Sequence, residues 1–131
     1  MRLLLDTHVF LWYITNNSKL SRSAFDAIRD KSNQAFLSVV SVWEALVKYQ
    51  VGKLLLPSPA NEYLNERRIA HRIADLPLDA QAVTHLLSLP LRHRDPFDRM
   101  LICQALQHEL TIVTGDEQFR HYPVAVLPAG A

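Results

Sequence analysis

The sequence DPFDRMLICQA (Asp95 to Ala105) predicts the start of a helix that is apolar on nearly all sides. Asp95 suits the N-cap and Pro96 the first helical position, which places Asp98 at the third. Residues three, four and seven positions after Asp98 are apolar, so Asp98 shares its helix face with the buried stripe. A carboxylate at the rim of an apolar interior is costly unless a cation meets it. We therefore expect the fold to bring more carboxylates to Asp98, with a metal ion between them.

Short apolar runs alternate with helical patterns along the rest of the chain. We expect strands at residues 2–5, 35–37, 73–76, 110–114 and 124–127. Helices are expected at residues 9–14, 21–31, 41–52, 61–71, 79–87 and 95–105, with a short one between residues 116 and 119. This alternation favours an α/β fold, a three-layer α/β/α sandwich with a mainly parallel central sheet, in a single domain over residues 1–131.

Composition excludes several classes of protein. Of the 131 residues 49% are apolar and 21% charged, as in ordinary globular proteins, and the net charge of +1 argues against coating of nucleic acid by bulk charge. The single cysteine, Cys103, rules out a disulfide framework and fits a reducing compartment. Because no apolar run is long enough to span a bilayer, we expect a cytoplasmic protein without a membrane partner.

Four carboxylates stand near predicted element ends. Asp6 directly follows the first strand, and Asp116 opens the short helix after Gly115. Glu44 is the last residue of the pattern Ser41-Val42-Trp43-Glu44, which is typical of a capping box. Each of these acids, like Asp98, has a simpler explanation in helix capping or in favourable interaction with the helix dipole. The alternative for the whole set is therefore four unconnected helix ends.

The geometry of a parallel sheet favours a shared site. The carboxyl ends of parallel strands lie along one edge, where ligands bind at the switch in strand order. Carboxylates gathered there repel one another unless a cation neutralises them. An all-oxygen ligand set without a Cys/His cluster suits Mg²⁺ or Mn²⁺, which commonly serve phosphoryl chemistry.

Four motifs in the right order and spacing resemble the PIN-domain ribonucleases, in particular VapC-type toxins of toxin–antitoxin pairs. They are LLLDTHVFLW (3–12), SVVSVWEALVKYQVGKLLLP (38–57), HRDPFDRMLICQAL (93–106) and LTIVTGDEQF (110–119). The resemblance covers nearly the whole chain. It implies a PIN-like fold, Mg²⁺- or Mn²⁺-dependent endoribonuclease activity, and an antitoxin that blocks the site.

The resemblance also assigns roles to residues. The family's first, second and fourth acids correspond to Asp6, Glu44 and Asp116, while Asp95 and Asp98 are both candidates for the third. We choose Asp98, because it lies on the apolar face, and keep Asp95 as a supporting cap. Asp6 and Asp98 are then expected to hold the ion. Thr7 and Thr114 match small hydroxyl residues beside the acids and are expected to hydrogen-bond a carboxylate or a water molecule; His8 is given no role.

Basic residues near the acidic motif suggest a contact with the phosphate backbone of RNA. Arg94 and Arg99 are the predicted substrate-binding residues. For Arg99 the alternative is a helical ion pair with Asp95, four residues before it.

Other functions compete with a ribonuclease toxin. One is a non-catalytic binding or scaffold module, and a less favoured one is a phosphatase with Asp6 as nucleophile, for which the usual Asp-x-Asp pattern is absent. The partners expected for the leading hypothesis are RNA, a cognate antitoxin and, as a homodimer, a second copy of the chain.

Overall fold

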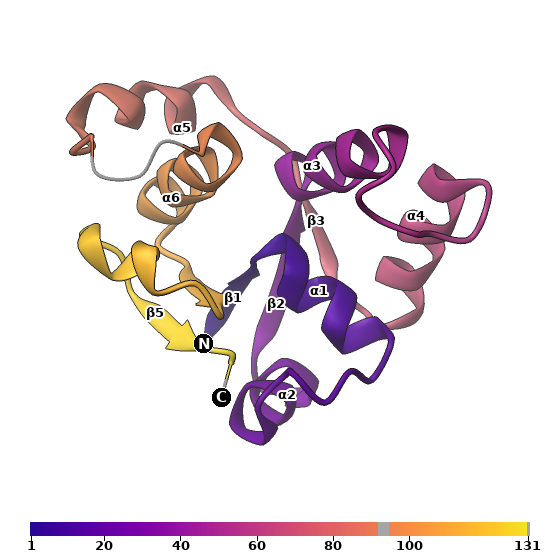
Figure 1. The fold of residues 1–131 in the computed structure, drawn as a ribbon. Coiled ribbons are helices and arrows are strands. Elements are labelled where there is room, and N and C mark those ends of the chain that lie inside the picture. The colour runs from indigo at the N-terminus through magenta and orange to yellow at the C-terminus, as the bar shows by residue number, and fades with distance from the viewer. Residues whose placement is uncertain (92–94, 131) are drawn as a thin grey trace.

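The structure, a computed structural model, describes residues 1–91 and 95–130. A five-stranded sheet runs through this part of the chain in the order β3-β2-β1-β4-β5 (Figure 1). All four strand pairings are parallel. The prediction of an α/β sandwich with a mainly parallel sheet is therefore confirmed.

The strands are short and separated by helices. They are β1 (Arg2–Leu5), β2 (Gln34–Ser38), β3 (Ala74–Leu76), β4 (Thr111–Thr114) and β5 (Val126–Pro128). The helices are α1 (Thr7–Ile14), α2 (Arg22–Arg29), α3 (Val39–Gln50), α4 (Ala60–Ala70), α5 (Ala80–Thr84) and α6 (Pro96–His108). Two 3₁₀ helices, η1 (His85–Ser88) and η2 (Glu117–His121), complete the described elements.

Helices cover both faces of the sheet (Figure 1). On one face Leu3 and Leu5 of β1 pack in a core that includes residues of α1, α2 and α4. On the other face Leu4 packs in a second core, built mainly with α6. Because alternate residues of a strand point to opposite faces, the continuous apolar run of β1 serves two cores at once. The result is the three-layer arrangement.

The strand order reverses between β1 and β4. From β1 the chain builds outward through β2 and β3, then returns to place β4 on the other side of β1 and β5 beyond it. In open parallel sheets a crevice forms at such a switch, beyond the carboxyl ends of the strands. Asp6 follows β1 directly and Thr114 ends β4, so both lie at this point.

The start of α3 corrects one prediction. The helix begins at Val39, and its N-cap is Ser38, whose hydroxyl accepts from the Val40 amide. Ser41 lies inside the first turn, so Ser41 and Glu44 do not form a capping box. The Ser38 hydroxyl also donates to the side chain of Gln104, which ties this helix start to α6. A pattern within the helix could not reveal that partner.

Other boundaries shift by a few residues. The last strand begins at Val126 rather than at residue 124, and the helix after Ser21 ends at Arg29 rather than near residue 31. Gly52 follows the end of α3 with φ of +79°, a conformation that glycine adopts easily, as expected for the residue after a helix. In the described part of the chain no helix is both long and apolar enough to cross a bilayer.

Candidate metal centre

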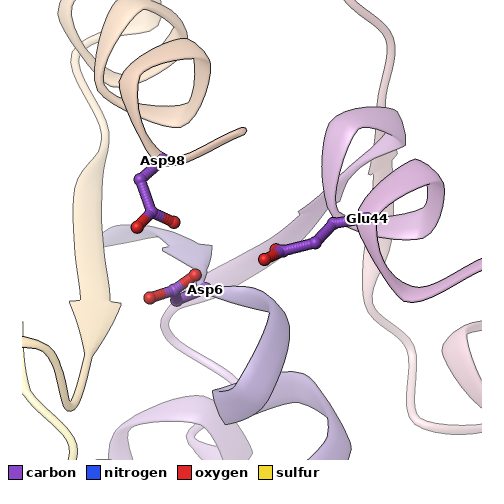
Figure 2. Close-up of side chains that lie close together, drawn as sticks. All are labelled: Asp6, Glu44 and Asp98. Carbon is purple, nitrogen blue, oxygen red and sulfur yellow. The ribbon is translucent and has the colours of Figure 1, made fainter. Parts of the chain in front are cut away.

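Three buried carboxylates meet at the switch point of the sheet. Asp6, Glu44 and Asp98 each offer an oxygen, and these oxygens all lie within 4.8 Å of one another. Figure 2 shows the three side chains pointing toward a common space from three separate segments. The residues are only 3%, 4% and 8% exposed, so the cluster lies away from bulk water.

Each acid is positioned by an element end or a helix face. Asp6 is the N-cap of α1, immediately after β1. Asp98 lies in the first turn of α6, and Asp95 is the N-cap of that helix, as predicted. Glu44 projects from the middle of α3. The structure thus brings Asp98 into the cluster and leaves Asp95 to cap the helix.

Hydrogen bonds fix both oxygens of Asp6. Oδ1 accepts from the Thr7 amide at 2.8 Å, and Oδ2 accepts from the Thr114 hydroxyl at 2.7 Å. Nδ1 of His8 lies 3.3 Å from the same Oδ2. The Gly115 amide donates to Nε2 of His8 at 3.0 Å, so the ring proton lies on Nδ1 and faces Asp6. His8 therefore links the loop after β4 to the carboxylate that follows β1.

Glu44 is held by two different partners. The Thr7 hydroxyl donates to Oε1, and Nζ of Lys48 lies 3.0 Å from Oε2, one helical turn away. Partial burial lowers the pKa of Lys48, but the hydrogen bond and charge of Glu44, with the charges of Asp95 and Asp98, raise it above its ordinary value. Lys48 thus keeps a positive charge beside the acidic cluster at neutral pH.

The electrostatics of the cluster suit a cation. Burial raises the pKa of Asp6 above its ordinary value, and the charge of Glu44 raises it further, although His8, Thr114 and Thr7 oppose the shift. A divalent cation would stabilise the ionised form of Asp6 and offset the repulsion between the carboxylates. Since the donors are all carboxylate oxygens, the residues present fit Mg²⁺ or Mn²⁺.

Asp116 does not join this group of carboxylates. Its side chain caps η2 by accepting from the Gln118 amide at 2.9 Å. Its own amide donates to the Thr114 hydroxyl, which donates to Asp6. Asp116 is therefore connected to the cluster through its backbone, and a catalytic role for its carboxylate stays a prediction.

The structure describes only one of the two predicted substrate-binding arginines. Arg94 lies outside the described residues. Arg99 is buried on α6, where its guanidinium donates to the Pro90 carbonyl at 2.9 Å and to the Tyr122 hydroxyl at 3.4 Å. These contacts give Arg99 a structural role between α6 and its surroundings, and its contact with RNA stays a prediction.

Sequence reasoning missed His8 and Lys48. For Lys48 a signal existed, because Glu44 and Lys48 are spaced four residues apart on one helix. For His8 the partner is Gly115, more than a hundred residues away, and no local pattern reveals it. A Cβ on Gly115 would approach Nε2 of His8 to 3.3 Å and the Trp12 ring to 3.4 Å, so this close packing favours glycine.

Comparison with known proteins agrees with this architecture. A family model described as "PIN domain" matches residues 3–125. Among curated proteins, Ribonuclease VapC22 of Mycobacterium tuberculosis is 24% identical over 120 residues, which cover 91% of this chain and 90% of that protein.

Solved structures share the fold. A crystal structure of VapBC2 from Rickettsia felis, bound to a DNA fragment from its promoter, contains a chain that matches with a TM-score of 0.72 and 17% identity, over 98% of this chain and 99% of that chain. DNA-bound VapBC from Salmonella typhimurium matches with a TM-score of 0.69 and 24% identity, over 98% of both chains.

Proposed function

Because this chain belongs to the PIN domain family, we propose that it is a metal-dependent endoribonuclease and the toxin of a toxin–antitoxin pair. The observation that carries the proposal is the cluster of three buried carboxylates at the switch point of the sheet. The similarity to Ribonuclease VapC22 along nearly the whole length of both proteins supports RNA as the substrate.

The residues divide the work of hydrolysis. Asp6 and Asp98 would hold the ion, Mg²⁺ or Mn²⁺. When bound, such an ion lowers the pKa of water and neutralises charge on the phosphate. Glu44 would orient the attacking water, while Thr7 keeps the Glu44 carboxylate in place. Water adds to phosphorus and one P–O ester bond breaks, leaving a phosphate on one RNA fragment and a hydroxyl on the other.

Thr114, His8 and Asp116 would act on the site through other residues. Thr114 and His8 restrict the rotation of the Asp6 carboxylate. The Asp116 amide orients the Thr114 hydroxyl. We keep Asp116 as a candidate fourth acid, with its carboxylate acting on the attacking water.

The partners follow from the relatives. The similar chains come from crystal structures named VapBC, and one solved relative from Klebsiella pneumoniae is named a toxin–antitoxin complex. We infer that this chain also binds a cognate antitoxin, in the cytoplasm. A row of exposed apolar side chains on α3, made by Val39, Trp43 and Val47, offers surface for such a partner or for a second copy of the chain.

The phosphatase alternative is less consistent with the site. Phosphatases of this kind usually carry a second aspartate two positions after the nucleophile, but here that position is His8, whose Nδ1 lies 3.3 Å from Asp6. The scaffold alternative requires an acidic cluster without catalysis, and the following experiment separates it from the nuclease.

The test is cleavage of total cellular RNA by the purified protein with Mg²⁺ or Mn²⁺, with the new ends mapped by sequencing. We expect discrete cleavage that EDTA abolishes. Asp6→Asn should stay folded and lose more than about 100-fold in rate, since even outer partners of a metal site typically cost 10–100-fold.

The matched control is Asp26→Asn, which changes an exposed acid paired with Arg22 far from the cluster. It should cleave RNA as the unmodified protein does. Cleavage that survives EDTA, or that survives Asp6→Asn, would exclude the proposed mechanism. Absence of cleavage together with absence of Mn²⁺ binding would favour the scaffold.

A further inference from the structure

A large hollow opens directly beside the metal centre. Its volume is about 610 Å³, within the usual range for sites that bind small molecules. Thr7 and His8 line it, and these two residues also contact the carboxylates of Glu44 and Asp6. The hollow runs from α1 to the segment between α3 and α4, where Leu54, Leu55 and Leu56 form part of its wall. Whatever occupies it lies next to the reacting groups.

The charges of this hollow are positive. Its ionised lining residues are Lys48 and Lys53. Within the described residues Lys53 is exposed and forms no ion pair, while Lys48 is half exposed although it contacts Glu44. Two ammonium groups beside a carboxylate cluster suit a ligand that brings its own negative charge.

The remaining walls are apolar or aromatic. Trp12 and Tyr63 line the hollow together with Leu11 and the three leucines after α3, and Asn17 and Thr15 add polar groups. A nucleobase has an apolar face and a polar edge, so walls of this mixed kind can take it. A nucleotide carries an anionic phosphate and a base with an apolar face, so ammonium groups beside apolar and aromatic walls suit it.

A second hollow, which Thr114 lines, has the opposite character. It is smaller, about 120 Å³, and Asp116 and Glu117 line it with Arg120 as the only basic neighbour in its described lining. Asp116 and Glu117 would repel an RNA phosphate, whereas Lys48 and Lys53 of the first hollow would attract it. The hollow lined by Thr7 and His8 is therefore the more favourable of the two for an anionic chain.

We propose that the hollow lined by Lys48, Lys53, Trp12 and Tyr63 binds the nucleotide adjacent to the scissile bond of an RNA chain. Its phosphate lies between the two ammonium groups and its base lies against the aromatic and leucine walls. This inference rests on the proposed function, because it takes RNA as the substrate. A segment of a protein partner is the competing occupant, and continuity with the reaction centre and paired positive charge favour RNA.

The test uses Trp12 as a reporter. The chain has two tryptophans, and the other, Trp43, is exposed and lies outside this hollow. In the Trp43→Phe protein, emission therefore comes from Trp12 alone. A four-nucleotide RNA is titrated in EDTA, where it is not cleaved. We expect saturable quenching of Trp12 and an affinity that falls as salt rises.

Lys53→Ala, made in the Trp43→Phe background, tests the charge. We expect it to weaken binding about two- to fivefold, as for one exposed ion pair, and to reduce the slope of log affinity against log salt by about 0.7. In the cleavage assay Lys53→Ala should raise KM more than it lowers kcat. The matched control is Lys31→Ala, an exposed lysine beside a different hollow, which should change none of these values.

Two outcomes would overturn the proposal. One is RNA cleavage by the protein without any response of Trp12 to the oligonucleotide. The other is an acidic peptide that quenches Trp12 where RNA does not, which would assign the hollow to a protein partner. If Trp12 responds to RNA, with the Lys53 effect, but no RNA is cleaved with Mn²⁺, the binding site stands and the proposed nuclease function fails.

Discussion

The Asp6 carboxylate is buried, so water solvates its charge poorly. It is 3% exposed, and its oxygens depend on Thr7, Thr114 and His8 for hydrogen bonds. Among these partners His8 is unusual because each ring nitrogen has a distinct contact, Nδ1 with Asp6 and Nε2 with the Gly115 amide. A side chain that connects the start of α1 to the loop after β4 in this way can hold the Asp6 carboxylate in one orientation.

Two conservative variants of His8 separate its two contacts. The amide nitrogen of His8→Asn lies near the place of Nδ1 and can still donate to Asp6. The amide oxygen of His8→Gln lies near the place of Nε2 and can still accept from Gly115. We expect His8→Gln to weaken Mn²⁺ binding by about tenfold, the lower end of the usual range for such partners, and His8→Asn to bind nearly as the unmodified protein.

Calorimetric titration with Mn²⁺ measures this difference without relying on catalysis. The melting temperatures of the two variants should be similar, so that stability alone cannot explain a gap in affinity. Equal affinities for Mn²⁺ in both variants would show that His8 has only a packing role beside Trp12.

At the level of the element, the start of α6 carries both a helix cap, Asp95, and a candidate metal ligand, Asp98. Oδ1 of Asp95 accepts from the amides of Phe97 and Asp98, at 2.9 and 3.2 Å. The cap therefore holds the backbone of the residue that carries the candidate ligand. Arg99, next along the helix, fastens the same turn to the Pro90 carbonyl and to Tyr122.

Replacing the cap should affect both stability and the site. We expect Asp95→Ala to lower the free energy of unfolding by about 1 kcal/mol, as typical for loss of an N-cap, and also to weaken Mn²⁺ binding because the first turn of α6 loosens. Denaturant unfolding and Mn²⁺ titration measure the two effects.

Ser21→Ala provides the matched control. Ser21 caps α2 by accepting from the Ala24 amide at 3.2 Å, and it takes no part in the carboxylate cluster. It should lose a comparable amount of stability and leave Mn²⁺ affinity unchanged. Unchanged affinity in Asp95→Ala as well would mean that capping and ligation are independent.

At the level of the whole molecule, the candidate metal centre is built from distant parts of the chain. Its three acids follow β1, lie on α3 and begin α6, so they meet only when the sheet and both helical layers are assembled. A ligand that binds only the folded state stabilises it by mass action, by about 2.7 kcal/mol at a concentration 100 times Kd. Metal binding should therefore stabilise the fold as a unit.

Without metal the cluster should destabilise the fold. The pKa of Asp6 is raised above its ordinary 3.8, so the folded state holds that proton more tightly than the unfolded state. The contribution of Asp6 to stability consequently falls as pH rises from about 3.8 through the raised pKa, and the loss is complete above it. At pH 7 in EDTA we expect Asp6→Asn to melt above the unmodified protein, by about 2–5 °C per kcal/mol gained.

Adding Mn²⁺ should reverse this order, raising the melting temperature of the unmodified protein and leaving that of Asp6→Asn unchanged. Asp26→Asn, on the surface of α2, should behave as the unmodified protein in both conditions. A lower melting temperature for Asp6→Asn in EDTA would show that the hydrogen bonds to the Asp6 carboxylate outweigh its cost of burial.

Local sequence predicted those features that depend on neighbouring residues. Apolar runs such as Leu3–Leu5 become strands because they must be buried on both faces, and Asp95-Pro96 begins a helix because cap and φ are both satisfied there. The different roles of Asp95 and Asp98 also follow from local pattern, since helical spacing places Asp98 on the apolar face. The capping box predicted from Ser41 and Glu44 was wrong, because the residue that caps α3 is Ser38, whose hydroxyl also donates to Gln104.

Amino-acid sequence alone therefore determined the layers of the fold and the edge of the sheet near which the acids lie. It also determined that Asp95 caps the helix while Asp98 lies on its apolar face. Only the tertiary structure decided that Asp6, Glu44 and Asp98 meet while the Asp116 carboxylate caps η2, and that His8 and Lys48 contact two of those acids. The physical reason is range. Capping and burial act over a few residues, whereas a cluster of charges is set by which strand ends become neighbours and by how far each side chain reaches across them.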